Sequence, residues 1–393
     1  MTIKERMSGN EAVAYAMKQI EPDVMAAFPI TPSTEIPQYF SKYLANGLVN
    51  TEFIAVESEH SAMSACMGAS AAGARATTAT SSAGLAYMWE ILYVVSASRL
   101  PVVMAVVNRA LSGPININND HSDSMGARDS GWIQLYSETN QEVYDNYIQA
   151  YLIAEATRLP VMVCQDGFIT SHGVSNIELL EDKKVKDFVG DYVPENYMLK
   201  ENSPMMAGPF ATIPYYMEIK RAQAEAMNTS YEVIEKVATA FASLSGRSYS
   251  FFEEYMMEDA EVAIIIISSS AGTAKEAVNI LRGEGKKVGL IKIRVFRPFP
   301  KERLTEALKG VNIVSVMDKA DSYSGIGGPL YSDVKNSLYD EPNKPHVINY
   351  IYGLGGRDIK VEEFIHIFND MINGTDLDDT YRYIGVRDKR GNI

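Results

Sequence analysis

The sequence predicts an α/β protein with two domains, each built around a mainly parallel sheet. Short apolar runs alternate with helical patterns through the first part of the chain, and a second series of this kind begins near Asp259. The length of 393 residues is also too great for one ordinary core. We therefore expect one domain over residues 1–240, which includes an irregular linker from about residue 171, and a second domain over residues 255–393.

The expected strands are short apolar runs bounded by turn-forming residues, and the expected helices have apolar residues at helical spacing. In the first domain, we expect strands at residues 23–28, 53–56, 76–80, 102–107 and 160–164, and helices over 59–73, 85–98 and 141–154. In the second domain, we expect strands at 262–267, 288–293 and 312–317. Between the domains, prolines interrupt the pattern until a polar helix over residues 216–242, which favours a connection or a dimer contact over a catalytic core.

The composition excludes several classes of function. The net charge is -14, and an acidic surface repels phosphate backbones and anionic lipids. The longest apolar region, residues 85–107, is interrupted by Glu90, Arg99 and Pro101, which argues against a membrane-spanning helix. Residues 1–6 lead into no apolar signal core, which favours a cytoplasmic protein. We expect neither nucleic acid nor a membrane as a partner.

Cysteine usage limits the metal chemistry of the chain. Cys66 and Cys164 are the two cysteines, and they form no CxxC pair. An iron–sulfur cluster or a four-thiolate zinc site needs more such ligands than this chain has. We interpret both cysteines as small buried residues and expect no metal bound by this chain alone.

The candidate site follows from the sheet geometry, because ligands of an open parallel sheet bind beyond the carboxyl ends of its strands. Four segments that follow expected strands would meet at that edge, namely residues 28–32, 57–60, 81–84 and 108–114. Their convergence, rather than any single loop, predicts the site.

Three side chains in these segments carry candidate chemistry. Glu57 follows a strand in apolar company, which would raise its pKa and prepare it to share a proton; the alternative is an acid at a helix start that the helix dipole stabilises. Arg109 would clamp a carboxylate with two parallel hydrogen bonds, unless it forms a surface salt bridge. Thr31 offers a hydroxyl to a ligand and also fits a helix N-cap before Pro32.

Two further patterns are weaker. Residues 120–123 (Asp-His-Ser-Asp) alternate acids with a histidine, but no third metal ligand stands at a suitable spacing, so we favour a structural hydrogen-bonding loop. The glycine-rich segments 325–328 and 353–356 are candidate phosphate loops, although tight turns are the preferred interpretation.

Several segments resemble signatures of the pyruvate:ferredoxin oxidoreductases. Residues 29–32 (PITP) resemble the family's YPITP signature, with Phe28 in place of the usual tyrosine, which removes a hydroxyl and any hydrogen bond it makes. The resemblance spans nearly the whole chain and has the length and domain order of a separate alpha subunit. The other segments that resemble the family are residues 56–62 (VESEHSA), 108–112 (NRALS), 120–123 (DHSD), 296–300 (FRPFP) and 352–358 (YGLGGRD).

The resemblance implies a thiamine-diphosphate pyrimidine-binding domain with a parallel sheet, followed by a transketolase C-terminal-like α/β domain. It implies that Glu57 hydrogen-bonds the aminopyrimidine ring and favours its imino tautomer. Thr31 and Arg109 would hold the 2-oxoacid, Arg109 and Ile30 would border the cofactor, and Pro29 would lie against the cofactor ring. The implied reaction is the reversible oxidative decarboxylation of pyruvate with coenzyme A to acetyl-CoA, carbon dioxide and reduced ferredoxin.

The resemblance also implies partner chains. The sequence has no GDG motif followed by an asparagine pair, so the half-site for diphosphate and magnesium is missing. A beta subunit would supply that half-site and a four-iron four-sulfur cluster, gamma and delta subunits would complete the complex, and ferredoxin would take the electrons. The chain is therefore expected to be inactive alone.

Alternatives remain at two levels. Within the family, branched-chain 2-oxoacids are the alternative substrates; 2-oxoglutarate or oxalate would need a second cation near Thr31, where the neighbouring residues 28–34 provide none. Outside the family, the rivals are the beta chain of a lipoamide-linked 2-oxoacid dehydrogenase and a non-catalytic scaffold subunit.

Overall fold

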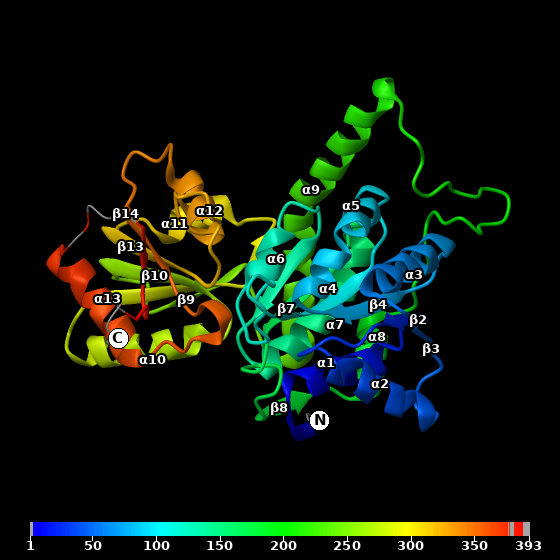
Figure 1. Ribbon diagram of the computed structural model, residues 1–393, viewed down its shortest axis with the longest axis horizontal. Helices are drawn as coiled ribbons and strands as arrows, with labels where there is room; N and C mark the ends of the chain where they lie inside the picture. The colour runs from blue at the N-terminus through cyan, green and yellow to red at the C-terminus, as the bar shows by residue number, and fades with distance from the viewer. Residues whose placement is uncertain (1–2, 376, 378–380, 388–393) are drawn as a thin grey trace.

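The computed structural model describes residues 3–375, 377 and 381–387. They form two α/β units side by side, each built on its own sheet (Figure 1). The larger hydrophobic cluster fills the first unit and continues into the second, which has a smaller cluster of its own. None of the described helices is long and apolar enough to cross a membrane.

The first sheet has seven strands in the order β12-β6-β7-β5-β4-β2-β3. All its neighbouring strands pair in parallel except β12, which runs antiparallel to β6, so the predicted parallel sheet is confirmed. The second half of the chain thus contributes an edge strand to the first sheet. The strands are β2 (Val24–Ala27), β3 (Glu52–Ala55), β4 (Ala76–Thr80), β5 (Val103–Asn108), β6 (Ile133–Ser137), β7 (Val161–Asp166) and β12 (Val295–Arg297).

Helices cover the two faces of this sheet (Figure 1). The helices that pack together on one face are α1 (Gly9–Ile20), α2 (Glu35–Ala45), α7 (Asn140–Thr157) and α8 (Asp182–Val189). Those on the other face are α3 (Glu59–Ala72), α4 (Ser82–Tyr87), α5 (Trp89–Ala97) and α6 (Ser122–Gly126), so the single helix expected over residues 85–98 is in fact a pair. An antiparallel pair outside this sheet consists of β1 (Ile3–Met7) and β8 (Ser175–Leu179).

The second sheet has six strands in the order β15-β14-β13-β10-β11-β9. It is parallel apart from β9 at one edge. Its strands are β9 (Phe252–Tyr255), β10 (Val262–Ile267), β11 (Val288–Ile293), β13 (Ile313–Asp318), β14 (His346–Ile351) and β15 (Tyr381–Tyr383). One face carries α10 (Ser270–Gly283) and α13 (Val361–Asn373), the other carries α11 (Lys301–Ala307) and α12 (Pro329–Leu338), and a short turn of 3-10 helix, η1 (Leu354–Gly356), follows β14.

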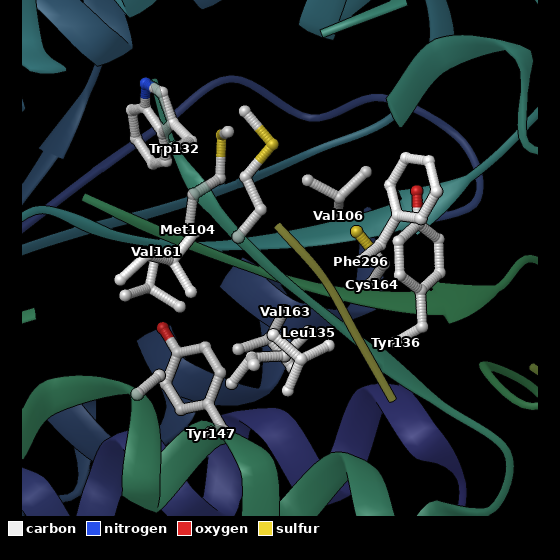
Figure 2. Close-up of a cluster of buried hydrophobic side chains, with 14 of the residues drawn as sticks. Met104, Val106, Trp132, Leu135, Tyr136, Tyr147, Val161, Val163, Cys164 and Phe296 are labelled. Atoms are coloured by element: carbon white, nitrogen blue, oxygen red, sulfur yellow. The ribbon is translucent and has the colours of Figure 1, made fainter. Parts of the chain in front are cut away.

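The edge strand β12 brings second-half side chains into the core of the first sheet. Phe296 packs edge-on against Tyr136 of β6, with ring centroids 6.1 Å apart (Figure 2). Cys164 lies beside this pair and, like Cys66, is buried and unpaired, as predicted. Burial raises the pKa of the Cys66 thiol to about 12. Both cysteines therefore serve as packing residues.

The long helix α9 (Ile213–Ser245) links the two units and extends beyond the predicted range at both ends. From Gln223 onward its inner side packs on α5 and α7, whereas its first turns and the loop before them project from the molecule (Figure 1). This projection exposes apolar side chains, including Leu199, Met206, Phe210, Ile213, Tyr216 and Met217.

Candidate functional site

Arg109 stands directly after β5, at the carboxyl edge of the first sheet, and is only 7% exposed. Its Nη1 group donates to the backbone oxygen of Thr31 at 2.9 Å, and its Nε group donates to the backbone oxygen of Asn116 at 3.0 Å. No carboxylate of the described residues pairs with it, so the surface salt-bridge interpretation is wrong. Within the same described residues its Nη2 group has no hydrogen-bond partner, which leaves a donor for an anion at this edge.

Asn10 fastens the segment that contains Thr31. Its Nδ2 group donates to the backbone oxygen of Pro32 at 2.9 Å, and its Oδ1 accepts from Nε2 of Gln165 at 3.2 Å. The Thr31 side chain is exposed, and α2 starts later in the chain, with Thr34 at the N-cap position. The predicted N-cap role of Thr31 is therefore wrong, and its hydroxyl is accessible to a ligand.

The buried carboxylate of Asp123 joins the ends of β4 and β5. Its Oδ2 accepts from the backbone nitrogens of Ser82 at 2.9 Å and Arg109 at 3.0 Å. Its Oδ1 accepts from Nδ2 of Asn108 at 2.8 Å and from the backbone nitrogen of Ser124 at 2.7 Å. Burial raises the pKa of Asp123 to about 6, against the lowering effect of these donors. The segment 120–123 is thus the hydrogen-bonding loop that the sequence predicted.

The same loop is bonded to the second unit. The backbone nitrogen of Gly355, which has a φ of 62°, donates to Oδ2 of Asp120 at 3.1 Å, so the glycine-rich segment forms a tight turn as predicted. His121 donates from Nε2 to Asp166 at 2.8 Å, and the ammonium group of Lys319 reaches the other oxygen of Asp166 at 2.8 Å. These three side chains are buried, so the second unit takes part in shaping this edge of the first sheet.

Glu57 does not have the environment that was predicted for it. Its side chain is exposed, and the hydroxyl of Ser61 donates to its carboxylate. This hydrogen bond holds the pKa of Glu57 below its usual value, whereas the prediction was a raised pKa in apolar surroundings. The prediction is wrong because the chain turns at Ser58, the N-cap of α3, which leaves Glu57 outside the helix and in contact with solvent.

Sequence reasoning missed Glu59, the first residue of α3. It is 7% exposed, and its carboxylate accepts no hydrogen bond from the described residues. It packs against Gly84, where a Cβ would lie 2.7 Å from Oε1 of Glu59 and 2.5 Å from Oγ1 of Thr80, so this position has no room for a larger residue. The hydroxyls of Thr80 and Ser81 are buried and likewise have no hydrogen-bond partner in the described parts of the chain. These four residues, which we call the Glu59 cluster, carry polar groups with unused hydrogen-bonding capacity among the described residues.

The structure joins some of the expected site residues and not others. Thr31 and Arg109 are in contact through the Thr31 carbonyl. Pro29 and Ile30 stand on the same segment, with Pro29 exposed and Ile30 half-buried. Glu57 is hydrogen-bonded to none of these four residues.

Three carboxylates of Glu138, Glu142 and Glu253 lie close enough to hold a metal ion. However, the ammonium group of Lys292 contacts all three, and that of Lys275 contacts Glu138 and Glu253. Two cations already balance these acids, so this cluster is an ion-pair network rather than a metal site.

The sequence is similar to those of known proteins over nearly all of its length. Residues 15–239 match the family model described as pyruvate flavodoxin/ferredoxin oxidoreductase, thiamine diphosphate-binding, and residues 260–364 match the pyruvate:ferredoxin oxidoreductase core domain II. The pyruvate synthase subunit PorA of Thermotoga maritima is 54% identical, over 97% of this chain and 98% of its own. The chain belongs to the pyruvate:ferredoxin oxidoreductase family. The resemblance seen in the sequence is thus confirmed.

Further similar proteins have names that refer to other substrates. The ketoisovalerate oxidoreductase subunit VorA of Pyrococcus horikoshii is 42% identical, over 94% of both chains. A solved 2-oxoglutarate:ferredoxin oxidoreductase from Magnetococcus marinus aligns with a TM-score of 0.72 at 22% identity, covering 94% of this chain and 65% of that one. A split-gene transketolase aligns with a TM-score of 0.55 at 12% identity, covering 93% and 98%. These two likenesses show the fold and confirm the predicted fold class.

The Glu59 cluster of this pyruvate:ferredoxin oxidoreductase chain has the kind of polar groups that the aminopyrimidine end of thiamine diphosphate would need. Glu59 is buried, and within the part of the chain that the structure describes its carboxylate and the buried hydroxyls of Thr80 and Ser81 have no hydrogen-bond partner. The absence of a side chain at Gly84 lets the Glu59 and Thr80 side chains approach it closely. A ring that carries both nitrogen donors and acceptors would satisfy such groups, since buried polar atoms are rarely left unpaired.

Proposed function

We propose that this chain is the alpha subunit of a multi-subunit, thiamine-diphosphate-dependent 2-oxoacid:ferredoxin oxidoreductase that acts on pyruvate. The observation that carries the proposal is that two features stand at the carboxyl edge of one sheet. They are a buried arginine with an unused donor and the Glu59 cluster, whose carboxylate has no hydrogen-bond partner among the described residues. Membership of the pyruvate:ferredoxin oxidoreductase family supports the same function. The overall reaction converts pyruvate, coenzyme A and two oxidised ferredoxins into acetyl-CoA, carbon dioxide, two reduced ferredoxins and a proton.

The residues divide the work between cofactor and substrate. Thiamine diphosphate, when bound, supplies the carbon that adds to the 2-oxo group and accepts the electrons of decarboxylation. We transfer the cofactor-glutamate role from Glu57 to Glu59, which would hold a proton against the pyrimidine ring in a site that excludes water. Arg109 would bind the substrate carboxylate through Nη2, and the Thr31 hydroxyl would donate to the keto group. Pro29 and Ile30 would line the cofactor side.

Partner chains complete the proposal. The family relatives are named as subunits, and we propose a beta subunit that binds the diphosphate with magnesium and carries a four-iron four-sulfur cluster. Gamma and delta subunits, ferredoxin and coenzyme A would complete the system, which we place in the cytoplasm. The two free thiols of this chain, both buried, agree with a reducing compartment.

Pyruvate is favoured over larger or more acidic 2-oxoacids. The segment around Thr31 provides no second cation for a second carboxylate. The relative at 54% identity is named for pyruvate, whereas the ketoisovalerate relative is 42% identical. Branched-chain 2-oxoacids are therefore the second candidate substrates.

The test is anoxic viologen reduction by the complex purified with its natural partners. Pyruvate, 2-oxoisovalerate and 2-oxoglutarate are each offered with and without coenzyme A, and the isolated chain serves as the negative control. We expect fast, coenzyme-A-dependent reduction with pyruvate and none from the isolated chain. Activity with another 2-oxoacid alone would change the substrate. Reduction of lipoamide but not of viologen would favour the dehydrogenase, and no reaction at all from a complex with clusters and thiamine diphosphate would favour the scaffold.

A further inference from the structure

We propose that Asp123 is a positioning residue, which fixes the backbone that carries Arg109 and thereby sets the affinity of the site for its 2-oxoacid. This inference rests on the proposed function, in which Arg109 binds the substrate carboxylate.

Asp123 connects two site segments that are otherwise separate in the chain. The ends of β4 and β5 each expose a backbone nitrogen at the carboxyl edge of the sheet, that of Ser82 and that of Arg109. Both donate to the same oxygen, Oδ2 of Asp123. One carboxylate oxygen therefore sets the spacing between the segment that follows β4 and the segment that follows β5 and carries the arginine.

The other oxygen of Asp123, Oδ1, also accepts two hydrogen bonds. It accepts from Nδ2 of Asn108 and from the backbone nitrogen of Ser124. Asp123 is 3% exposed, so with four donors around it no lone pair is left for a substrate. It acts on the reaction only through the groups it holds.

Only a carboxylate accepts all four of these hydrogen bonds. An asparagine would turn its amide donor either toward the nitrogens of Ser82 and Arg109 or toward those of Asn108 and Ser124. Each orientation places an N–H group against two other N–H groups, so two of the four bonds are lost.

The side chain of Arg109 is held in place as well as its backbone. With the Arg109 backbone nitrogen held by Asp123, the side chain bonds the Thr31 and Asn116 carbonyls. Three fixed contacts then determine where the remaining donor, Nη2, points. A shift of about 1 Å in such a group can cost up to about a hundredfold in rate.

The experiment compares Asp123→Asn, Arg109→Ala and the double variant in the assembled complex. We expect Asp123→Asn to raise the KM for pyruvate about tenfold or more, with a smaller change in kcat at saturating pyruvate. We expect the double variant to have the same KM as Arg109→Ala, because residues that act through one another are not additive.

The matched control is Asp318→Asn in the second unit. Asp318 is also a buried aspartate that accepts from two backbone nitrogens, those of Leu330 and Tyr331, and from an asparagine amide, that of Asn349. Its loss should lower the unfolding midpoint without raising the KM. If Asp123→Asn does not assemble, Asn108→Ala removes one of its donors and should raise the KM severalfold in the same direction.

The possible outcomes distinguish a failure of the positioning role of Asp123 from a failure of the proposed role of Arg109. If Arg109→Ala raises the KM but Asp123→Asn does not, or if the two effects multiply, the positioning role is overturned. A KM increase in Asp318→Asn equal to that in Asp123→Asn would mean general destabilisation and would also overturn it. If Arg109→Ala leaves the KM unchanged, the proposed function of Arg109 is what fails.

Discussion

At the scale of single residues, two glutamates at the start of α3 have opposite environments. Glu59 is buried near the Thr80 hydroxyl, which has no partner among the residues that the structure describes, whereas Glu57 is exposed and accepts a hydrogen bond from Ser61. We predict that Glu59→Gln lowers kcat of the assembled complex about a hundredfold or more, because an amide cannot share a carboxyl proton with a ring nitrogen. Glu57→Gln should stay within about twofold, as surface substitutions usually do. Both are measured by viologen reduction at saturating pyruvate and thiamine diphosphate; a slow Glu57→Gln with a normal Glu59→Gln would restore the first assignment.

The sequence was sufficient to predict that residues 57–60 belong to the site, but not which of their two glutamates is buried. Strand ends can be predicted from apolar runs, so the positions of Thr31 and Arg109 at one edge followed from the pattern alone. The choice between Glu57 and Glu59 depends on where the chain turns, and Ser58 decides that as the N-cap of α3. Its capping signal was visible in the sequence, and it places Glu59 inside the helix and Glu57 outside it.

At the scale of elements, a buried ion pair fastens the end of α9 to α7. Asp145 of α7 is fully buried, and Nε and Nη2 of Arg247 donate to its two oxygens at 2.6 Å and 2.7 Å. We predict that Arg247→Ala lowers the free energy of unfolding by about 3–5 kcal/mol, because it leaves a buried carboxylate without its cation. Lys183→Ala, which removes an exposed pair with Asp187 on α8, should cost less than about 0.5 kcal/mol. Urea unfolding of the isolated chain measures the loss of unfolding free energy in both variants. Equal losses would show that the buried ion pair stabilises the fold no more than the exposed one.

Long apolar runs and clear helical spacing predicted many of the elements, but several strands were missed. The five strands expected in the first domain and the helix over residues 141–154 each have a matching element. The strand β6 was missed because Gln134 and Ser137 interrupt its apolar run, although both are fully buried. The strand β12 has three residues, too few to show any period, and only its pairing with β6 makes it a strand.

At the scale of the whole molecule, the two units are joined by contacts that no local pattern contains. Asp166 at the end of β7 meets His121 from the first unit and Lys319 from the second, 153 positions away in the chain. The charge of Lys319, assisted by His121, outweighs the effect of burial and holds the pKa of Asp166 below its usual range. The sequence predicted a structural loop at residues 120–123, but its partners across the interface depend on tertiary packing and could not be read from spacing.

This junction gives a pH-dependent prediction for Lys319→Met. In the natural chain Asp166 is ionised when folded, so its contribution to stability is present above the pKa of an unfolded aspartate and is lost only as the pH falls through its lowered folded pKa. Without the ammonium group, the buried carboxylate of Asp166 loses the charge that favours its ionised form most. The variant is therefore penalised most at neutral pH, and the penalty falls as the pH is lowered and the junction takes up a proton. We expect a deficit of about 3–5 kcal/mol at pH near 7.5, which narrows toward pH 5. Urea unfolding of both chains across this range measures the gap, and a deficit that stays constant with pH would show that Lys319 stabilises the junction by packing rather than by charge.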